Sequence, residues 1–299
     1  MEIRLLFVLL LSVLPVIHAF AADKNGIDIV AVVGLPGNVQ NTARDAVVAT
    51  LAEEYSIHTI SLPDFKKIAR AEYQAVPKLA LGNDACEFTA AEPGEAIVFC
   101  ALVSTASLSS IRESNPGRIL QAVVVDQPSS RQIAAAHWTY PELKRFSILT
   151  SDENNNPIVP DGTSVLRFSY RPDISLSSQI SNAIEHADAL VALPEHGIFN
   201  SSSLRTVLLT AYGYAKPVVG YSRSYVKAGA LITTYSTPIQ IMRQVLELWP
   251  ELKSDDFATV HMPKYFSIET NGSVARSLGL KKRVIVTPSL DYTDTEFLP

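Results

Sequence analysis

The sequence has few of the basic clusters that nucleic-acid binding requires. Its 299 residues include 25 lysines and arginines against 30 aspartates and glutamates, and the formal net charge is −5 at pH 7. Phosphate binding depends on clustered Lys and Arg, whereas this chain offers only the short run Lys281-Lys282-Arg283. A run of this length is more typical of a solvated helix end. The charge pattern argues against nucleic acid as the main partner.

Common catalytic and cofactor motifs are also missing. Gly34-Leu35-Pro36-Gly37 is not a G-x-G-x-x-G motif, and Pro36 lacks the backbone N–H that a phosphate loop would use. The chain has no P-loop lysine and no G-x-S-x-G motif. Its six histidines are scattered, without the H-x-x-x-H spacing of a metal site. We therefore expect a protein that is not an enzyme, with no cofactor, no metal and no catalytic residues.

Cysteine is scarce, with only Cys86 and Cys100. A disulfide between them is chemically permitted if the protein is exported to an oxidising compartment. Their positions also fit a helix residue and a strand residue that pack as small hydrophobic side chains, and we slightly favour this second interpretation. The sequence leaves both interpretations open.

The N-terminus has the pattern of a secretion signal. Arg4 precedes an apolar run from Leu5 to Ile17, and Ala19-Phe20-Ala21 follows it. This order predicts a cleaved signal peptide over residues 1–21, with a buried core helix as the alternative. The apolar run is too short to span a bilayer comfortably, and no cysteine for a lipid anchor follows it. We expect a soluble periplasmic protein without a lipid anchor.

The rest of the chain alternates short apolar runs with amphipathic stretches. Strands are predicted at Ile29–Val33, Ala96–Leu102 and Leu120–Val125, where Val, Ile and Leu dominate. Such runs indicate strands covered on both faces, as in parallel sheets. The pattern restarts after Arg131, with further strands at Phe146–Leu149, Ala189–Leu193 and Pro217–Tyr221.

Two such series, in a chain too long for one ordinary domain, predict an α/β fold of two doubly wound parallel-sheet lobes joined by a hinge. We expect residues 22–125 and 260–299 in the first lobe and residues 126–259 in the second.

Three polar residues follow predicted strands, where ligand sites of α/β proteins form. Asp126 and Glu195 would support acid–base catalysis if they faced each other across a cleft. Helix capping and contact with a polar solute are the alternatives, and we favour them. His196 fits a ligand contact and a solvated loop residue equally well.

Several segments of the second half resemble a known family. These include Ala-Asp-Ala-Leu-Val-Ala-Leu-Pro (187–194), Ile-Phe-Asn (198–200), the stretch from Lys216 to Leu231, and Val-Ala-Arg-Ser-Leu-Gly-Leu (274–280). Together they resemble bacterial ABC-transporter substrate-binding proteins of the type I periplasmic-binding fold. The most similar branch includes binders of aromatic amino acids.

The resemblance implies a small organic solute held between two lobes and delivered to an ABC importer, with an amino-acid-like solute as one candidate. The alternative is an orphan sensing protein that reports to a membrane signalling partner. Either would act as a monomer with an ABC permease or a membrane sensor as its partner. The implied solute-binding residues are Ser104, Asp126, Gln127, Pro194, Glu195, Phe199, Asn200, Tyr221 and Ser222.

Overall fold

The computed structural model describes residues 28–34, 38–67, 73–152, 156–252 and 259–283. The predicted secretion signal lies outside these residues, as does most of the Gly34–Gly37 turn. Among the described helices, none combines the length and the apolar character needed to cross a membrane.

The first lobe is built on a six-stranded sheet with the strand order β11-β5-β4-β3-β1-β2. Every neighbouring pair of these strands is parallel. The central strands are almost wholly buried because their apolar side chains are covered on both faces. The strands are β1 (Ile29–Val33), β2 (Ile57–Ser61), β3 (Lys78–Leu81), β4 (Val98–Val103), β5 (Leu120–Val124) and β11 (Val260–His261).

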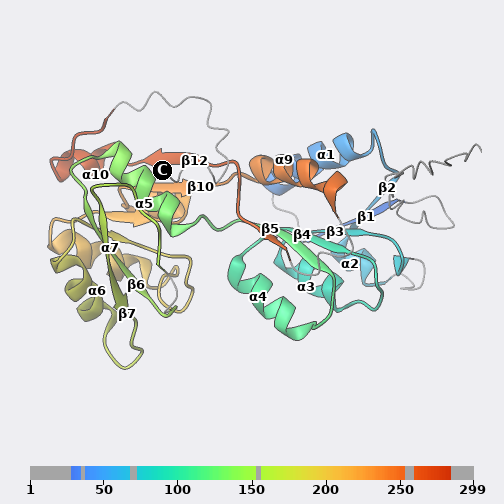
Figure 1. Cartoon of the computed structure of the whole chain (residues 1–299), viewed down its shortest axis with the longest axis horizontal. Helices are drawn as coiled ribbons and strands as arrows, with labels where there is room; N and C mark the ends of the chain where they lie inside the picture. The colour runs from blue at the N-terminus through green and yellow to red at the C-terminus, as the bar shows by residue number, and fades with distance from the viewer. Residues whose placement is uncertain (1–27, 35–37, 68–72, 153–155, 253–258, 284–299) are drawn as a thin grey trace, which may run out of the picture.

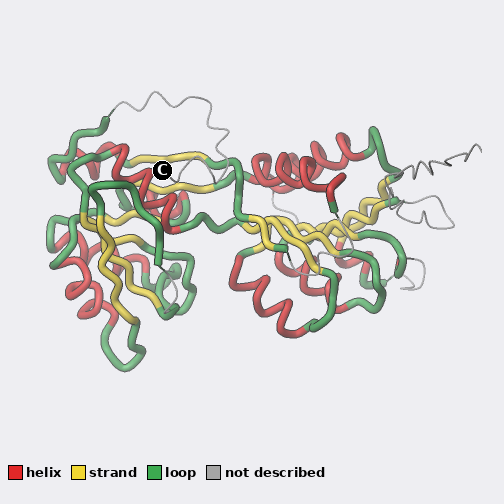
Figure 2. Tube along the Cα trace, in the orientation of Figure 1, coloured by secondary structure: helices red, strands yellow, loops and turns green. Residues whose placement is uncertain are grey.

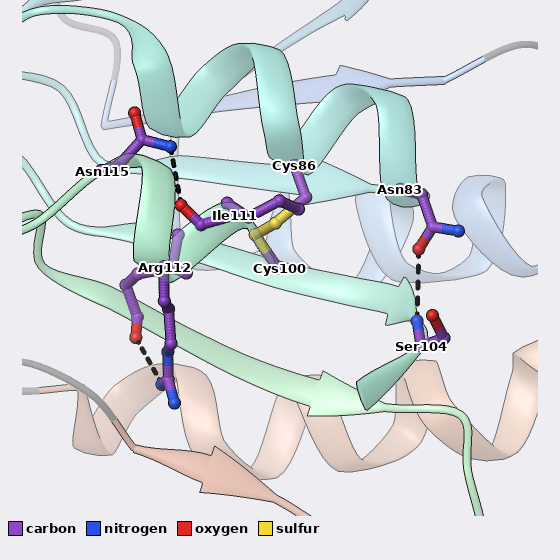
Figure 3. The surroundings of a disulfide bond; sticks show 8 residues. Asn83, Cys86, Cys100, Ser104, Ile111, Arg112 and Asn115 are labelled. Atoms are coloured by element: carbon purple, nitrogen blue, oxygen red, sulfur yellow. Dashed lines mark hydrogen bonds between the residues drawn. A yellow bond between two sulfur atoms is a disulfide. The ribbon is translucent and has the colours of Figure 1, made fainter. Parts of the chain in front are cut away.

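Helices cover both faces of this sheet. Figure 1 shows α1 (Asn38–Leu51) beside α9 (Pro238–Leu248) on one face, and α2 (Leu62–Phe65), α3 (Asn83–Ala91) and α4 (Thr105–Ser114) on the other. A disulfide joins Cys86 of α3 to Cys100 of β4, with the two Cα atoms 5.5 Å apart (Figure 3). Both cysteines are fully buried. Of the two interpretations that the sequence left open, the structure has the disulfide.

The second lobe repeats the design with the strand order β12-β10-β9-β8-β6-β7. All neighbouring pairs are parallel except β10 and β12, which are antiparallel. The strands are β6 (Arg145–Thr150), β7 (Ser164–Ser169), β8 (Ala189–Val191), β9 (Val218–Gly220), β10 (Ile232–Tyr235) and β12 (Ser267–Thr270). The helices are α5 (Ser129–Thr139), α6 (Leu176–Glu185), α7 (Leu204–Gly213), α8 (Arg223–Ala228) and α10 (Gly272–Ser277).

The chain crosses between the lobes three times, after β5, after β10 and between β11 and β12. Figure 2 shows these crossings as loops between the two sheets. The predicted pair of doubly wound lobes is confirmed.

The lobe boundaries differ from those we expected. Helix α9, expected in the second lobe, packs on the first sheet, where Ile241 and Val245 lie in one apolar cluster with Phe99. The short helix η2 (Trp249–Glu251) follows it there, and the Trp249 ring meets the Phe99 ring edge-on at 5.9 Å. Strand β12, expected in the first lobe, pairs with β10 of the second. Helical periodicity shows which face of α9 is apolar, but it does not show which sheet covers that face.

Candidate functional site

A cleft of about 430 Å³ lies between the two lobes. Both lobes contribute residues at the carboxyl ends of their parallel strands, which is the usual place for a ligand site in α/β proteins. The first lobe contributes Asn83, Leu102, Ser104, Val125 and Asp126. The second contributes Pro194, His196, Tyr221, Ser222, Arg223, Tyr235 and Ser236.

Asn83 and Ser104 are held together on the first-lobe wall. Gly82 has φ of +100°, a backbone conformation that favours glycine, and it turns the chain from β3 directly into α3. The turn places Asn83 beside the end of β4, where its Oδ1 accepts a hydrogen bond from the Ser104 N–H at 3.2 Å (Figure 3). The Ser104 hydroxyl caps α4 by accepting from the Ser107 N–H at 3.2 Å.

Asp126 is anchored on the same wall. One of its carboxylate oxygens accepts a hydrogen bond from the Thr105 N–H at 2.6 Å. Thr105 is the first residue of α4, so the carboxylate lies at the positive end of the helix dipole. Burial raises the pKa of Tyr221 on the facing lobe, and the negative charge of Asp126 raises it further. Both effects favour the protonated phenol of Tyr221.

Two aromatic residues pack together at the start of α8: Tyr221 lines the cleft, and Tyr225 is buried in the second-lobe core. The Tyr221 hydroxyl donates to the carbonyl oxygen of Phe199 at 3.0 Å, and the Tyr221 ring lies 4.8 Å from that of Tyr225. This close packing needs glycine at the end of β9. A Cβ added to Gly220 would lie 2.4 Å from the Cβ of Tyr225.

Arg223 supplies a positive charge to this wall. Its Nε donates to a Glu269 carboxylate oxygen on β12 at 2.7 Å. Its guanidinium carbon also lies 5.2 Å from the centre of the Tyr235 ring. The cleft thus has a carboxylate on one lobe and a guanidinium on the other, with the Tyr235 ring beside the guanidinium.

Five of the nine predicted site residues line this cleft: Ser104, Asp126, Pro194, Tyr221 and Ser222. The other four make contacts elsewhere. Gln127 is buried in the first crossing, and Phe199 is fully buried in the second-lobe core. Asn200 accepts hydrogen bonds at Oδ1 from the N–H groups of Ser202 and Ser203.

Glu195 points back into its own lobe. Its carboxylate accepts hydrogen bonds from the Ser151 N–H at 2.9 Å, from the Ser151 hydroxyl at 2.7 Å and from the Thr150 hydroxyl. The pair of acids that would have supported catalysis, Asp126 and Glu195, is therefore not brought together in the cleft lining. Within the described ranges, no group of three or more His, Cys, Asp or Glu side chains could hold a metal ion.

The prediction omitted Asn83, Leu102, Val125, Arg223, Tyr235 and Ser236, and it left His196 open. All of them lie within five residues of the end of a strand, so the sequence carried a signal for each. What the sequence does not show is which strand-end side chains turn toward the facing lobe.

No protein-family model matches the chain, and no curated protein sequence does. Solved structures do resemble it. A ligand-free, open substrate-binding protein with adhesive properties from Clostridium difficile aligns over 86% of this chain and 97% of that one, with a TM-score of 0.58 and 13% sequence identity. An ABC domain in complex with L-Trp from Streptococcus pneumonia covers 85% of this chain and 95% of its own, with a TM-score of 0.47 and 15% identity. The chain shares its fold with the substrate-binding protein from Clostridium difficile.

Proposed function

We propose that this chain is an extracytoplasmic solute-binding protein that holds a small organic solute between its lobes and delivers it to an ABC importer. The observation that supports this most is the cleft of about 430 Å³, which takes polar and aromatic side chains from both lobes. Its volume lies within the range of small-molecule sites. The fold, shared with a substrate-binding protein, is consistent with this function.

The charges in the cleft favour a solute that carries groups of both signs. Asp126 offers a carboxylate on one wall, and Arg223, whose Nε is bonded to Glu269, offers its remaining guanidinium N–H groups on the other. Tyr221 and Tyr235 provide ring faces against which an apolar part of the solute can pack. An amino-acid-like solute has this combination of groups, so it is the class that we propose.

Closure of the lobes would couple binding to transport. A solute in contact with both walls stabilises a closed arrangement more than an open one and so shifts the population toward it. The partner that recognises the closed form would be an ABC permease, or a membrane sensor if the protein signals instead. The buried disulfide fits the oxidising compartment that this role requires, and we propose a monomeric protein in the periplasm.

The direct test is mass spectrometry of any compound released from protein purified without refolding, together with a thermal-shift screen of amino acids and sugars. We expect at least one amino acid to raise the melting temperature, since binding to the native state alone stabilises it. Asp126→Asn and Tyr221→Ala should reduce the shift. Asp188→Asn is the matched control, because the Asp188 carboxylate bonds to the N–H groups of Lys144 and Arg145 away from the cleft.

Two results would count against the proposal. If no compound of the panel raises the melting temperature, the cleft is not a solute site for these classes. If the bound compound is recovered chemically altered after incubation, the protein is an enzyme.

A further inference from the structure

The three segments that cross between the lobes are joined to one another by side-chain hydrogen bonds. Nε2 of Gln127, in the segment after β5, donates to Oγ of Ser236, in the segment after β10, at 2.8 Å. The Ser236 hydroxyl donates in turn to the carbonyl oxygen of Tyr265, in the segment between β11 and β12, at 2.6 Å. Two consecutive hydrogen bonds therefore span all three crossings.

Arg131 completes this network from the first turn of α5. Its Nη1 donates to Oε1 of Gln127 at 2.8 Å and to the carbonyl oxygen of Pro263 at 2.6 Å. Its guanidinium carbon lies 4.6 Å from the centre of the Phe266 ring. Gln127 and Arg131 are only 4% and 5% exposed. Buried amide and charged groups are costly unless they are hydrogen-bonded, so this network has a strongly preferred geometry.

Ser236 belongs to the cleft as well as to the network. It lines the cleft directly after Tyr235. Its hydroxyl donates a hydrogen bond to the carbonyl oxygen of Tyr265, and one of the two lone pairs on Oγ accepts a hydrogen bond from Nε2 of Gln127. The second lone pair can accept one more hydrogen bond, so a solute donor in the cleft can bond to the same atom that joins the crossings.

We propose that Gln127 and Arg131 are positioning residues that set the angle between the lobes, because their hydrogen bonds hold the three crossing segments together. Ser236 links this hydrogen-bond network to the cleft. Segments tied in this way bend together, whereas untied segments bend independently and allow a wider range of lobe angles. Gln127 thus contributes to the site through the hinge and not by touching solute. Only the link through Ser236 rests on the proposed function, since the hydrogen-bond network sets the lobe angle of the empty protein too.

The test is a distance distribution between spin labels on the two lobes, measured without any added solute. Ser109→Cys on α4 and Thr206→Cys on α7 are exposed positions for the labels, and the native disulfide is kept. We expect the unaltered hinge to give one narrow distribution. Gln127→Ala should broaden that distribution and shift its mean.

Gln179→Ala is the matched control. Gln179 is 8% exposed and bonds only within the second lobe, where its Oε1 accepts from the Arg171 N–H and its Nε2 donates to the carbonyl oxygens of Arg171 and Ile174. It should lower the melting temperature and leave the distance distribution unchanged. The proposal is overturned if Gln127→Ala keeps the native circular dichroism and the original distribution, or if both variants broaden it equally.

Ser236 variants serve if Gln127→Ala does not fold. Ser236→Ala removes both hydrogen bonds that span the crossings and should broaden the distribution, whereas Ser236→Thr keeps a hydroxyl and should restore it. A wild-type distribution in Ser236→Ala would overturn the proposal. Because no solute is used, a solute screen that fails would reject the proposed function without affecting this test.

Discussion

The Asp126 carboxylate accepts a hydrogen bond from the backbone N–H of Thr105 at 2.6 Å, which ties the end of β5 to the first turn of α4. The same side chain lines the cleft. Its structural role and its proposed role in binding are therefore separable, because an amide oxygen can keep the hydrogen bond but not the charge.

Asp126→Asn should lower the stability of the protein only slightly but greatly weaken its affinity for the solute. We expect the free energy of unfolding to fall by no more than about 1 kcal/mol, since only the interaction between charge and helix dipole is lost. Affinity for an amino-acid solute should fall at least about tenfold, because hydrogen bonds to charged groups contribute more than neutral ones. Urea unfolding and calorimetric titration measure the two effects, and equal affinities in both proteins would remove Asp126 from the binding site.

Loss of the Cys86–Cys100 disulfide should destabilise the first lobe. The bond closes a loop with a sequence separation of 14 residues, for which chain entropy predicts roughly 3 kcal/mol. Cys86→Ala combined with Cys100→Ala should lower the melting temperature, and a reducing agent should do the same to the wild-type protein. The double variant is its own control, since its melting temperature should not respond to the reducing agent. A response of equal size in both proteins would show that the agent acts elsewhere.

Gly220→Ala should disturb the packing of Tyr221, which lines the cleft, against the buried Tyr225. The new Cβ would lie 2.4 Å from the Cβ of Tyr225, too close for any real contact. We expect a loss of on the order of 2 kcal/mol or more in unfolding free energy and weaker solute binding through displacement of Tyr221. Gly213→Ala is the matched control, because nothing lies within 4 Å of its added Cβ at the end of α7. Similar losses in both variants would contradict this account.

Lys78 should make the free energy of unfolding depend on pH in the alkaline range. Its Nζ is buried at the start of β3, where it donates to the carbonyl oxygens of Tyr73 and Val76 at 2.7 and 3.0 Å. Burial lowers the pKa of Lys78 from 10.5 to about 8. Between about pH 8 and pH 10.5 the unfolded chain therefore binds more protons than the folded one, so the contribution of Lys78 to stability rises with pH.

The measurement is the unfolding free energy of wild type and Lys78→Met as a function of pH. The difference between their curves should change by on the order of 2–3 kcal/mol from pH 7.5 to pH 10.5. Below about pH 6.5 the difference should be constant, because Lys78 is then protonated in both states. Parallel curves across the whole range would show that the Lys78 pKa is not lowered.

Part of the fold could be read from local sequence alone. Apolar runs such as Val98–Val103 have no alternation, and this predicts a strand covered on both faces wherever it is placed. The capping Ser104 and the turn glycine Gly82 mark the ends of elements for equally local reasons. Strand ends in turn indicate the edge of the sheet at which a site can form.

The cleft could be predicted only in part, because two residues at similar strand ends can point in opposite directions. Asp126 lines the cleft, while Glu195, also directly after a strand, bonds to Ser151 of its own lobe. Gln127 follows Asp126 immediately, yet it is buried between crossing segments that are far apart in the sequence. No local pattern distinguishes these outcomes.

The amino-acid sequence by itself determined the alternation of strands and helices, the pair of parallel sheets and the strand ends at which polar residues gather. These depend on side-chain periodicity and backbone preference over a few residues. Only the tertiary structure decided that α9 covers the first sheet, that Cys86 and Cys100 bond, and that Gln127, Ser236 and Tyr265 join the three crossings. The reason is physical: each depends on which distant surfaces pack together, and that is decided by the whole core.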